Sequence, residues 1–189
     1  FPSHPLALEW LRQCPYVVCC DGAANTYIRS GRMPEAIVGD GDSLLPDIKE
    51  RYASLIHSEA EQETNDLSKA FRFCLSQERK RITIMGATGK REDHTIGNVS
   101  LLADYMEQAE VSMMTDYGIF VPIREDSMFE SYIGQQISVF NMNSTALSAE
   151  GLAYPLSVFT NWWQGTLNEA LARHFIIRTE GKVLVFRVF

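Results

Sequence analysis

Short apolar runs that stop at small polar residues recur in the first half of the chain. Residues 16–20, 37–38 and 82–85 are rich in β-branched and other apolar side chains, and each run ends at aspartate or glycine. Runs of this length and composition predict buried strands. Apolar positions at helical spacing follow Asn65 and Asp93 and predict amphipathic helices. The alternation of strands and helices predicts a mostly parallel, Rossmann-like α/β half.

The pattern changes from about residue 110 onward. Residues 111–114, 119–122, 127–133, 136–140 and 144–147 are short apolar runs with turn residues between them, which is typical of antiparallel sheet. Residues 175–178 and 183–188 flank a turn at Glu180 and Gly181 and are predicted to form a closing hairpin. We therefore predict an α/β fold with a parallel α/β domain over residues 1–109 and an antiparallel β-sandwich over residues 110–189.

Composition narrows the classes of partner. The 189 residues carry a net charge of −7, so no basic surface is expected for nucleic acid or for an anionic membrane. No apolar run approaches the length of a membrane span. The four cysteines lack C-x-x-C spacing, which favours reduced thiols in a cytoplasmic protein. An acidic protein that handles a polyphosphate would need a divalent cation to offset the repulsion between them.

Two carboxylates follow the second predicted strand, in the sequence Ile37-Val38-Gly39-Asp40-Gly41-Asp42-Ser43. The glycines allow a tight turn, which leaves Asp40 and Asp42 crowded at the end of the strand. A hard, oxygen-preferring cation would relieve their repulsion. The alternative is an Asx-turn in which the side chains cap local amides.

Asp66 lies at the start of a predicted helix, with Thr64 or Asn65 as its N-cap. Taken alone, this position favours a carboxylate because of the helix dipole, with no ligand required. Asp21, Asp40 and residues 86–94 follow predicted strands, however, and the carboxyl ends of parallel strands form the ligand crevice of such sheets. We therefore expect these segments and Asp66 to converge on one metal-dependent site.

The turn at residues 86–94 is not a P-loop, because the spacing G-x-x-x-x-G-K-[ST] fails there. Asn98 follows His94 by one helical turn, and a polar contact is expected for it. In the second half, Tyr154 and Asn168 could hold a flat heterocycle by stacking and hydrogen bonding. Trp162 and Trp163 are expected to belong to the core of the sandwich.

Six segments, in chain order, are similar to the signature of the thiamine pyrophosphokinase (thiamine diphosphokinase) family of the bacterial type. They are residues 21–25 (DGAAN), 39–43 (GDGDS), 62–66 (QETND), 86–94 (GATGKREDH, with Asn98), 151–156 (GLAYPL) and 165–169 (GTLNE). Each segment alone is weakly specific, but this many in order are specific, and they span nearly the whole chain. Gly41 and Leu167 depart from the residues common in the family.

The resemblance implies transfer of a pyrophosphoryl group from ATP to the hydroxyl of thiamine, with Mg²⁺ as cofactor and thiamine diphosphate and AMP as products. It also implies a homodimer with active sites at the subunit interface, and a further strand ahead of Phe1. ATP and Mg²⁺ would bind to residues 1–109, whereas residues 110–189 would bind thiamine and form the dimer.

Residue-by-residue carry-over of the family motifs assigns three sets of side chains. The metal would be held by Asp21, Asp40, Asp42 and Asp66. ATP would be bound by Asn25, Ser43, Arg91, Asp93 and Asn98. Thiamine would be bound by Gln62, Tyr154, Thr166 and Asn168. Asp66 or Asp93 would be the catalytic residue that accepts the hydroxyl proton.

Two other functions fit the same residues. A metal-dependent phosphohydrolase could use the aspartate cluster with water as nucleophile, acting on a nucleotide or a thiamine phosphate. A non-catalytic module could bind thiamine or its phosphates without reaction. Formation of AMP that depends on thiamine would separate the three functions.

Overall fold

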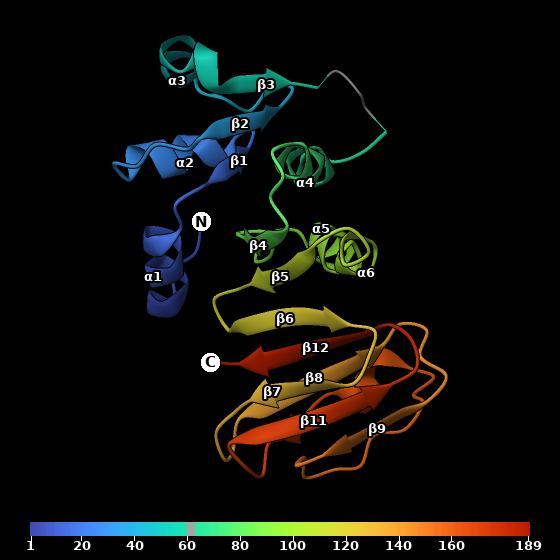
Figure 1. Ribbon diagram of the computed structural model, residues 1–189. Helices are drawn as coiled ribbons and strands as arrows, with labels where there is room; N and C mark the ends of the chain where they lie inside the picture. Colours follow the sequence, from blue (N-terminus) through green and yellow to red (C-terminus); the bar gives the residue numbers. More distant parts are fainter. Residues whose placement is uncertain (60–62) are drawn as a thin grey trace. The chain divides into compact units, whose positions relative to one another are not determined.

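The computed structural model describes residues 1–59 and 63–189 (Figure 1). It divides into two compact units, Phe1–Ile82 and Thr83–Phe189, which are described separately. No helix among the described residues is long and apolar enough to span a membrane.

Unit 1 is built on three parallel strands in the order β1-β2-β3. Its strands are β1 (Val18–Cys20), β2 (Ala36–Gly39) and β3 (Ile56–Ser58), and its helices are α1 (Pro5–Gln13), α2 (Ala23–Arg29), α3 (Pro46–Arg51), the 3₁₀ turn η1 (Ala53–Leu55) and α4 (Asp66–Ser76). All four residues of β2 are buried, as expected for the central strand of a sheet covered on both faces.

The two faces of this sheet are packed by different helices. Cys19 and Ile37 belong to a core with α2, whereas Cys20 and Val38 pack with α4 on the other face. Adjacent strand residues point to opposite faces, so Cys19 and Cys20 contribute to separate cores. Helices therefore cover both faces of the parallel sheet (Figure 1).

Unit 2 contains two sheets. A six-stranded sheet has the order β10-β8-β12-β6-β5-β4, and a three-stranded sheet has the order β7-β11-β9. The strands are β4 (Arg81–Met85, which begins at the end of unit 1), β5 (Glu110–Met114), β6 (Gly118–Ile123), β7 (Ser127–Glu130), β8 (Gln136–Asn141), β9 (Leu147–Glu150), β10 (Asn168–Glu169), β11 (His174–Thr179) and β12 (Val183–Val188). The helices are α5 (Glu92–Ser100), α6 (Leu102–Tyr105) and the 3₁₀ turn η2 (Trp162–Gly165).

One hydrophobic core joins the two sheets of unit 2. Ile137, Val139 and Val185 from the large sheet pack with Phe175 and Ile177 from the small one. In the large sheet, the antiparallel pairs are β5–β6, β6–β12, β12–β8 and β8–β10. Both pairs of the small sheet, β7–β11 and β11–β9, are antiparallel as well. The predicted combination of a parallel sheet with antiparallel sheets is confirmed.

The β4 strand joins β5 in the large sheet, where Thr83 and Ser112 share a hydrogen bond of 3.2 Å between their hydroxyls. Two predictions of detail are wrong. The β11 and β12 strands do not form a hairpin: β11 pairs with β7 and β9, and β12 pairs with β6 and β8, because the connection crosses from one sheet to the other. Trp162 and Trp163 lie outside the core and are exposed. The domain boundary at residues 109 and 110 stays a prediction.

Candidate active site

Asp21 follows β1 in a strained and crowded position. Its backbone has a φ of 32°, a region that side chains other than glycine rarely adopt, and the residue is only 4% exposed. Gly39, with a φ of 155°, makes room for it, because a Cβ on Gly39 would lie 2.7 Å from the Cβ of Asp21. The end of β2 therefore needs glycine so that Asp21 can occupy this position.

The carboxylate of Asp21 is satisfied on one side only. Its Oδ2 accepts a hydrogen bond from the backbone N–H of Ser43 at 3.0 Å, whereas its Oδ1 is buried with no hydrogen-bond partner among residues 1–59 and 63–189. A buried carboxylate oxygen without a partner is costly, because it has lost water and gained nothing in exchange. This oxygen therefore points to a ligand that supplies positive charge or a proton.

Asn25 and Ser43, both assigned to ATP by the family resemblance, hold two loops together. The Asn25 amide donates to the carbonyl of Ser43 at 2.8 Å and accepts from the N–H of Leu45 at 3.0 Å. With the bond from Ser43 to Asp21, three hydrogen bonds fix the loop after β2 against the loop after β1 and the first turn of α2. The described contacts of Asn25 are thus structural, and they place the two acidic loops side by side.

The loop after β2 contains the Asx-turn that the sequence allowed. Asp40 Oδ1 accepts from the N–H of Asp42 at 3.0 Å, and Gly41 between them has a φ of 77°. The Nζ of Lys49 donates to the carbonyl of Gly41 at 3.0 Å, which further fixes the turn. One carboxylate oxygen of Asp40 is thus occupied by this local hydrogen bond. Asp42 is exposed, so its side chain can reach a ligand.

Asp66 opens α4, and Asn65 is the N-cap, accepting from the N–H of Ser68 at 2.9 Å. The carboxylate of Asp66 is 38% exposed and pairs with the ammonium of Lys69 at 3.3 Å. Lys69 was missed in the sequence, where a lysine at this spacing resembles a solvated surface residue. Its burial depends on how α4 packs against β1 and β2, which no local pattern reveals.

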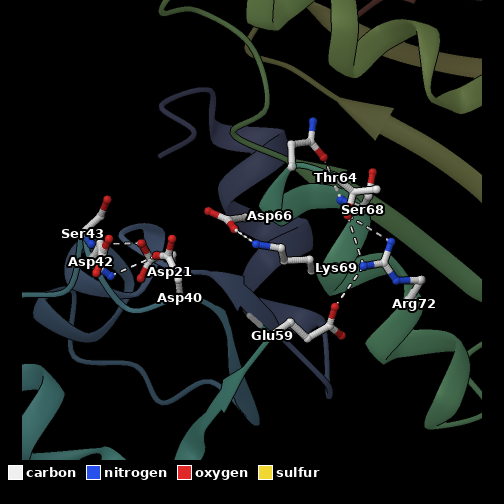
Figure 2. Close-up of polar contacts among 11 residues, drawn as sticks. Asp21, Asp40, Asp42, Ser43, Glu59, Thr64, Asp66, Ser68, Lys69 and Arg72 are labelled. Carbon is white, nitrogen blue, oxygen red and sulfur yellow. Dashed lines mark hydrogen bonds and ion pairs between the residues drawn. The ribbon is translucent and has the colours of Figure 1, made fainter. Parts of the chain in front are cut away.

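Asp66 and Asp21 approach the same place in unit 1. Burial raises the pKa of the Cys20 thiol to about 12, and among the smaller causes are the charges of Asp66 and Asp21. Figure 2 shows the Asp66 carboxylate and the Lys69 ammonium directed toward the side on which Asp21, Asp40 and Asp42 lie. Within the described residues, however, no group of three or more His, Cys, Asp or Glu side chains is close enough to hold a metal ion by itself.

The glycine turn and α5 contribute the nucleotide residues expected in unit 2. Arg91 donates to both oxygens of Asp93, at 3.1 and 2.6 Å, and both side chains are exposed. The hydrogen bond from Arg91 is the main cause that lowers the pKa of the Asp93 carboxyl, which makes it a weaker proton acceptor. Asn98 donates to the carbonyl of Ala87 at 2.8 Å, so the predicted polar contact ties α5 to the turn.

The thiamine residues expected in unit 2 lie around β10. The amide of Asn168 is buried and bonded to the backbone of Tyr154 at both its N–H and its carbonyl, at 3.0 and 2.8 Å, and it also accepts from the N–H of Glu169. The ring of Tyr154 is 64% exposed, and Thr166 donates to the carbonyl of Trp163. Gln62 lies outside the described residues.

The fold and these loops define a class of protein: an α/β unit with carboxylates at the ends of parallel strands, followed by a β-rich unit. A profile described as the catalytic domain of thiamin pyrophosphokinase matches residues 7–114, and one described as its substrate-binding domain matches residues 118–186. The chain belongs to the thiamin pyrophosphokinase family, and the resemblance identified in the sequence is confirmed.

Individual relatives agree with this assignment. Thiamine pyrophosphokinase 1 of Oryza sativa subsp. japonica is 30% identical over 129 residues, which cover 55% of this chain and 49% of that protein. Thiamine pyrophosphokinase of Bacillus subtilis is 34% identical over 86 residues, covering 43% of this chain and 40% of that one. The chain spans about half the length of the curated relatives it matches.

The fold is also that of solved members of the family. The crystal structure of thiamine pyrophosphokinase from Bacillus subtilis superposes with a TM-score of 0.83, covering 98% of this chain and 92% of that chain at 21% identity. Thiamin pyrophosphokinase from Candida albicans gives a TM-score of 0.81, covering 99% and 85% at 20% identity.

Proposed function

We propose that the chain transfers the pyrophosphoryl group of ATP to the hydroxyl of thiamine, giving thiamine diphosphate and AMP. Membership of the family supports the reaction. The structural observation that carries the site is the Oδ1 atom of Asp21, which is buried beside a second acidic loop and has no partner among the residues that the structure describes. A site with this charge suits a ligand that brings a cation with it.

Mg²⁺ is the cation that we propose, held by Asp21, Asp40, Asp42 and Asp66. Mg²⁺ is usually bound through one or two carboxylates together with substrate phosphates, and seldom by a complete cage of protein ligands. This preference is consistent with carboxylates that approach one another but, in the described part of the chain, form no cluster of three ligands. When bound, the cation would neutralise charge on the triphosphate and on the leaving AMP.

The protein itself would act by positioning the two substrates and by excluding competing reactions. Phosphoryl-type transfer needs little covalent help, because its transition state carries charge on peripheral oxygens and is loose. The thiamine hydroxyl would attack the β-phosphorus with AMP as leaving group. Either Asp66 or Asp93 would accept the hydroxyl proton, and the hydrogen bond from Arg91 lowers the pKa of Asp93, which weakens this carboxylate as a base.

On the nucleotide side, we assign Arg91, Asp93 and Asn98, with Asn25 and Ser43 shaping the loop of unit 1. The guanidinium of Arg91 already binds a carboxylate through two donors, a geometry that also suits phosphate oxygens. On the thiamine side, we assign Gln62, Tyr154, Thr166 and Asn168. The exposed ring of Tyr154 supplies a flat face, and Asn168 fixes the backbone that carries it.

We further propose a homodimer formed through the β-rich half. Trp163 is 72% exposed, and Trp162, Tyr154 and Leu167 are also exposed, which is more apolar surface than a lone unit needs. An apolar groove in unit 2 lies beside this surface and is lined by aliphatic and aromatic side chains, among them Ile96, Val99, Phe120, Phe140 and Trp162. Light scattering at micromolar concentration tests the proposal, and a fully active monomer would contradict it.

We also propose that the first half is a Rossmann-like domain and the second half a β-sandwich. Helices on both faces of the parallel sheet support a Rossmann-like first domain, and the core shared by two antiparallel sheets supports a β-sandwich. The family profiles meet between residues 114 and 118, which supports a functional boundary near residue 109. The four free thiols support a reducing, cytoplasmic location.

One assay separates the proposed reaction from its alternatives. AMP and thiamine diphosphate are measured with and without thiamine and with and without Mg²⁺. We expect both products only when thiamine, ATP and Mg²⁺ are all present. A phosphohydrolase would release product without thiamine, and a binding module would release none.

Variants of the acidic loop test the assignment of the site. Asp40→Asn and Asp42→Asn should each abolish turnover while the protein stays folded, since removing one of several like charges does not destabilise their cluster. Asp47→Asn, an exposed aspartate in the first turn of α3, is the matched control and should remain active. Near-normal activity in the first two variants would refute the assignment.

A further inference from the structure

Lys69 is a buried cation that the proposed reaction has not used. Its side chain is 4% exposed, and its Nζ makes one ion pair within the part of the chain that the structure describes, to Oδ1 of Asp66 at 3.3 Å. An ammonium group has three donors, and a buried charge needs close partners to offset its desolvation. One long contact to a carboxylate that is 38% exposed offsets little of the desolvation cost of this ammonium group.

The position of Lys69 on α4 makes this arrangement more costly. Asp66 opens the helix, so Lys69 is the fourth residue of α4 and lies within its first turn. The N-terminus of a helix carries partial positive charge, which stabilises anions and disfavours cations. A lysine buried at this point is therefore poised for an anion that the protein itself does not provide.

The surrounding charges indicate which anion this is. Asp21, Asp40, Asp42 and Asp66 would repel a polyphosphate, even when one divalent cation offsets part of their charge. Lys69 points toward the same side as these carboxylates (Figure 2). Lys49, which also lies near the acidic loops, is already bonded to the carbonyl of Gly41.

We propose that Lys69 binds a phosphoryl oxygen of the triphosphate when Asp66 turns to the cation. The inference rests on the proposed function, and it assigns Lys69 as a second source of positive charge in the site. Asp66 then has two partners in turn: Lys69 keeps it in place before the nucleotide arrives, and the cation takes it afterwards. Lys69 exchanges one oxygen ligand for another, so its charge is paired in both states.

The test compares Lys69→Met with Lys80→Met, an exposed lysine that lies outside the site. Methionine keeps most of the buried stem and removes the charge. Loss of a hydrogen bond to a charged group should weaken ATP binding by about 10- to 100-fold, measured by calorimetry with Mg²⁺ present. Binding of adenosine, which carries no phosphate, should be unchanged, as should the KM for thiamine. The control variant should match the wild type for all three ligands.

A purely structural role for Lys69 predicts a different result. In that case Lys69→Met would lower the melting temperature and weaken ATP and adenosine alike, or leave both unchanged, and either outcome would overturn the inference. If Lys69→Met does not fold, the wild type with ¹⁵N-labelled lysine replaces it. The Nζ resonance of Lys69 should then shift on adding ATP but not on adding adenosine, and the absence of that difference would overturn the inference.

Failure of this inference can be told from failure of the proposed function. If the wild type makes AMP and thiamine diphosphate but Lys69→Met binds ATP normally, only the role of Lys69 is wrong. If the wild type binds ATP but makes no product with thiamine, the reaction is wrong, while selective loss of ATP binding in Lys69→Met would still support the phosphate contact.

Discussion

Replacing Asn168 by alanine should destabilise unit 2 and weaken thiamine binding together. Asn168 is 4% exposed, and its side chain makes three hydrogen bonds: two to the backbone of Tyr154 and one to the N–H of Glu169. A typical intramolecular hydrogen bond contributes about 1 kcal/mol net, so the three together contribute about 3 kcal/mol. For a chain of this length, that loss corresponds to a fall in melting temperature of roughly 6–12 °C.

The effect on substrates should be selective. Asn168 fixes the backbone of Tyr154, so its loss frees the ring that we assign to thiamine, whereas the nucleotide residues lie elsewhere in the chain. We expect the KM for thiamine to rise by about tenfold or more and the KM for ATP to change little. Steady-state kinetics with each substrate varied in turn, and a thermal melt of each variant, provide the measurements.

The matched control is Glu169→Ala, which removes an exposed side chain next to Asn168 and keeps the backbone N–H that bonds to it. This variant should stay within about 0.5 kcal/mol of the wild type. A melting temperature for Asn168→Ala within about 2 °C of the wild type would show that the three bonds do not stabilise the protein. An unchanged KM for thiamine would show that the pocket lies elsewhere.

Two further predictions concern stability and thiol chemistry. Glu78→Gly should stabilise the protein by about 0.5–1 kcal/mol, measured by denaturant unfolding, because Glu78 directly follows the C-cap of α4 and has a φ of 58°. Gln77→Gly, where φ is −90°, should destabilise it by a similar amount. A thiol reagent at about pH 8 should modify the exposed Cys14 rapidly, and all four cysteines only after unfolding, since burial raises the pKa of Cys19 and Cys20 to about 12. The unfolded thiols lose their protons first, so the free energy of unfolding should fall as the pH rises from about 9 toward 12. Equal effects of the two glycine variants, or fast labelling of all four thiols in the native protein, would contradict these expectations.

Features set by neighbouring residues could be predicted from the sequence. Asn65 caps α4 because a side-chain oxygen followed by an amphipathic run is a local signal. Cys19 and Cys20 face different cores because strand residues alternate. Gly39 and Gly41 have positive φ after a buried strand, as the turn chemistry requires. The motifs around Asp21 and Asp40 identified the family for the same reason: their spacing along the chain is itself the signal.

The sequence by itself therefore determined that a parallel half precedes an antiparallel half, where the carboxylates fall and which family the chain belongs to. The tertiary structure alone decided which strands pair, and it placed β4 beside β5 and separated β11 from β12. It also decided that the Asn168 amide is used by the Tyr154 backbone and that Lys69 is buried. Strand pairing and burial depend on contacts between residues far apart in the chain, and a periodicity read over ten residues carries no information about them.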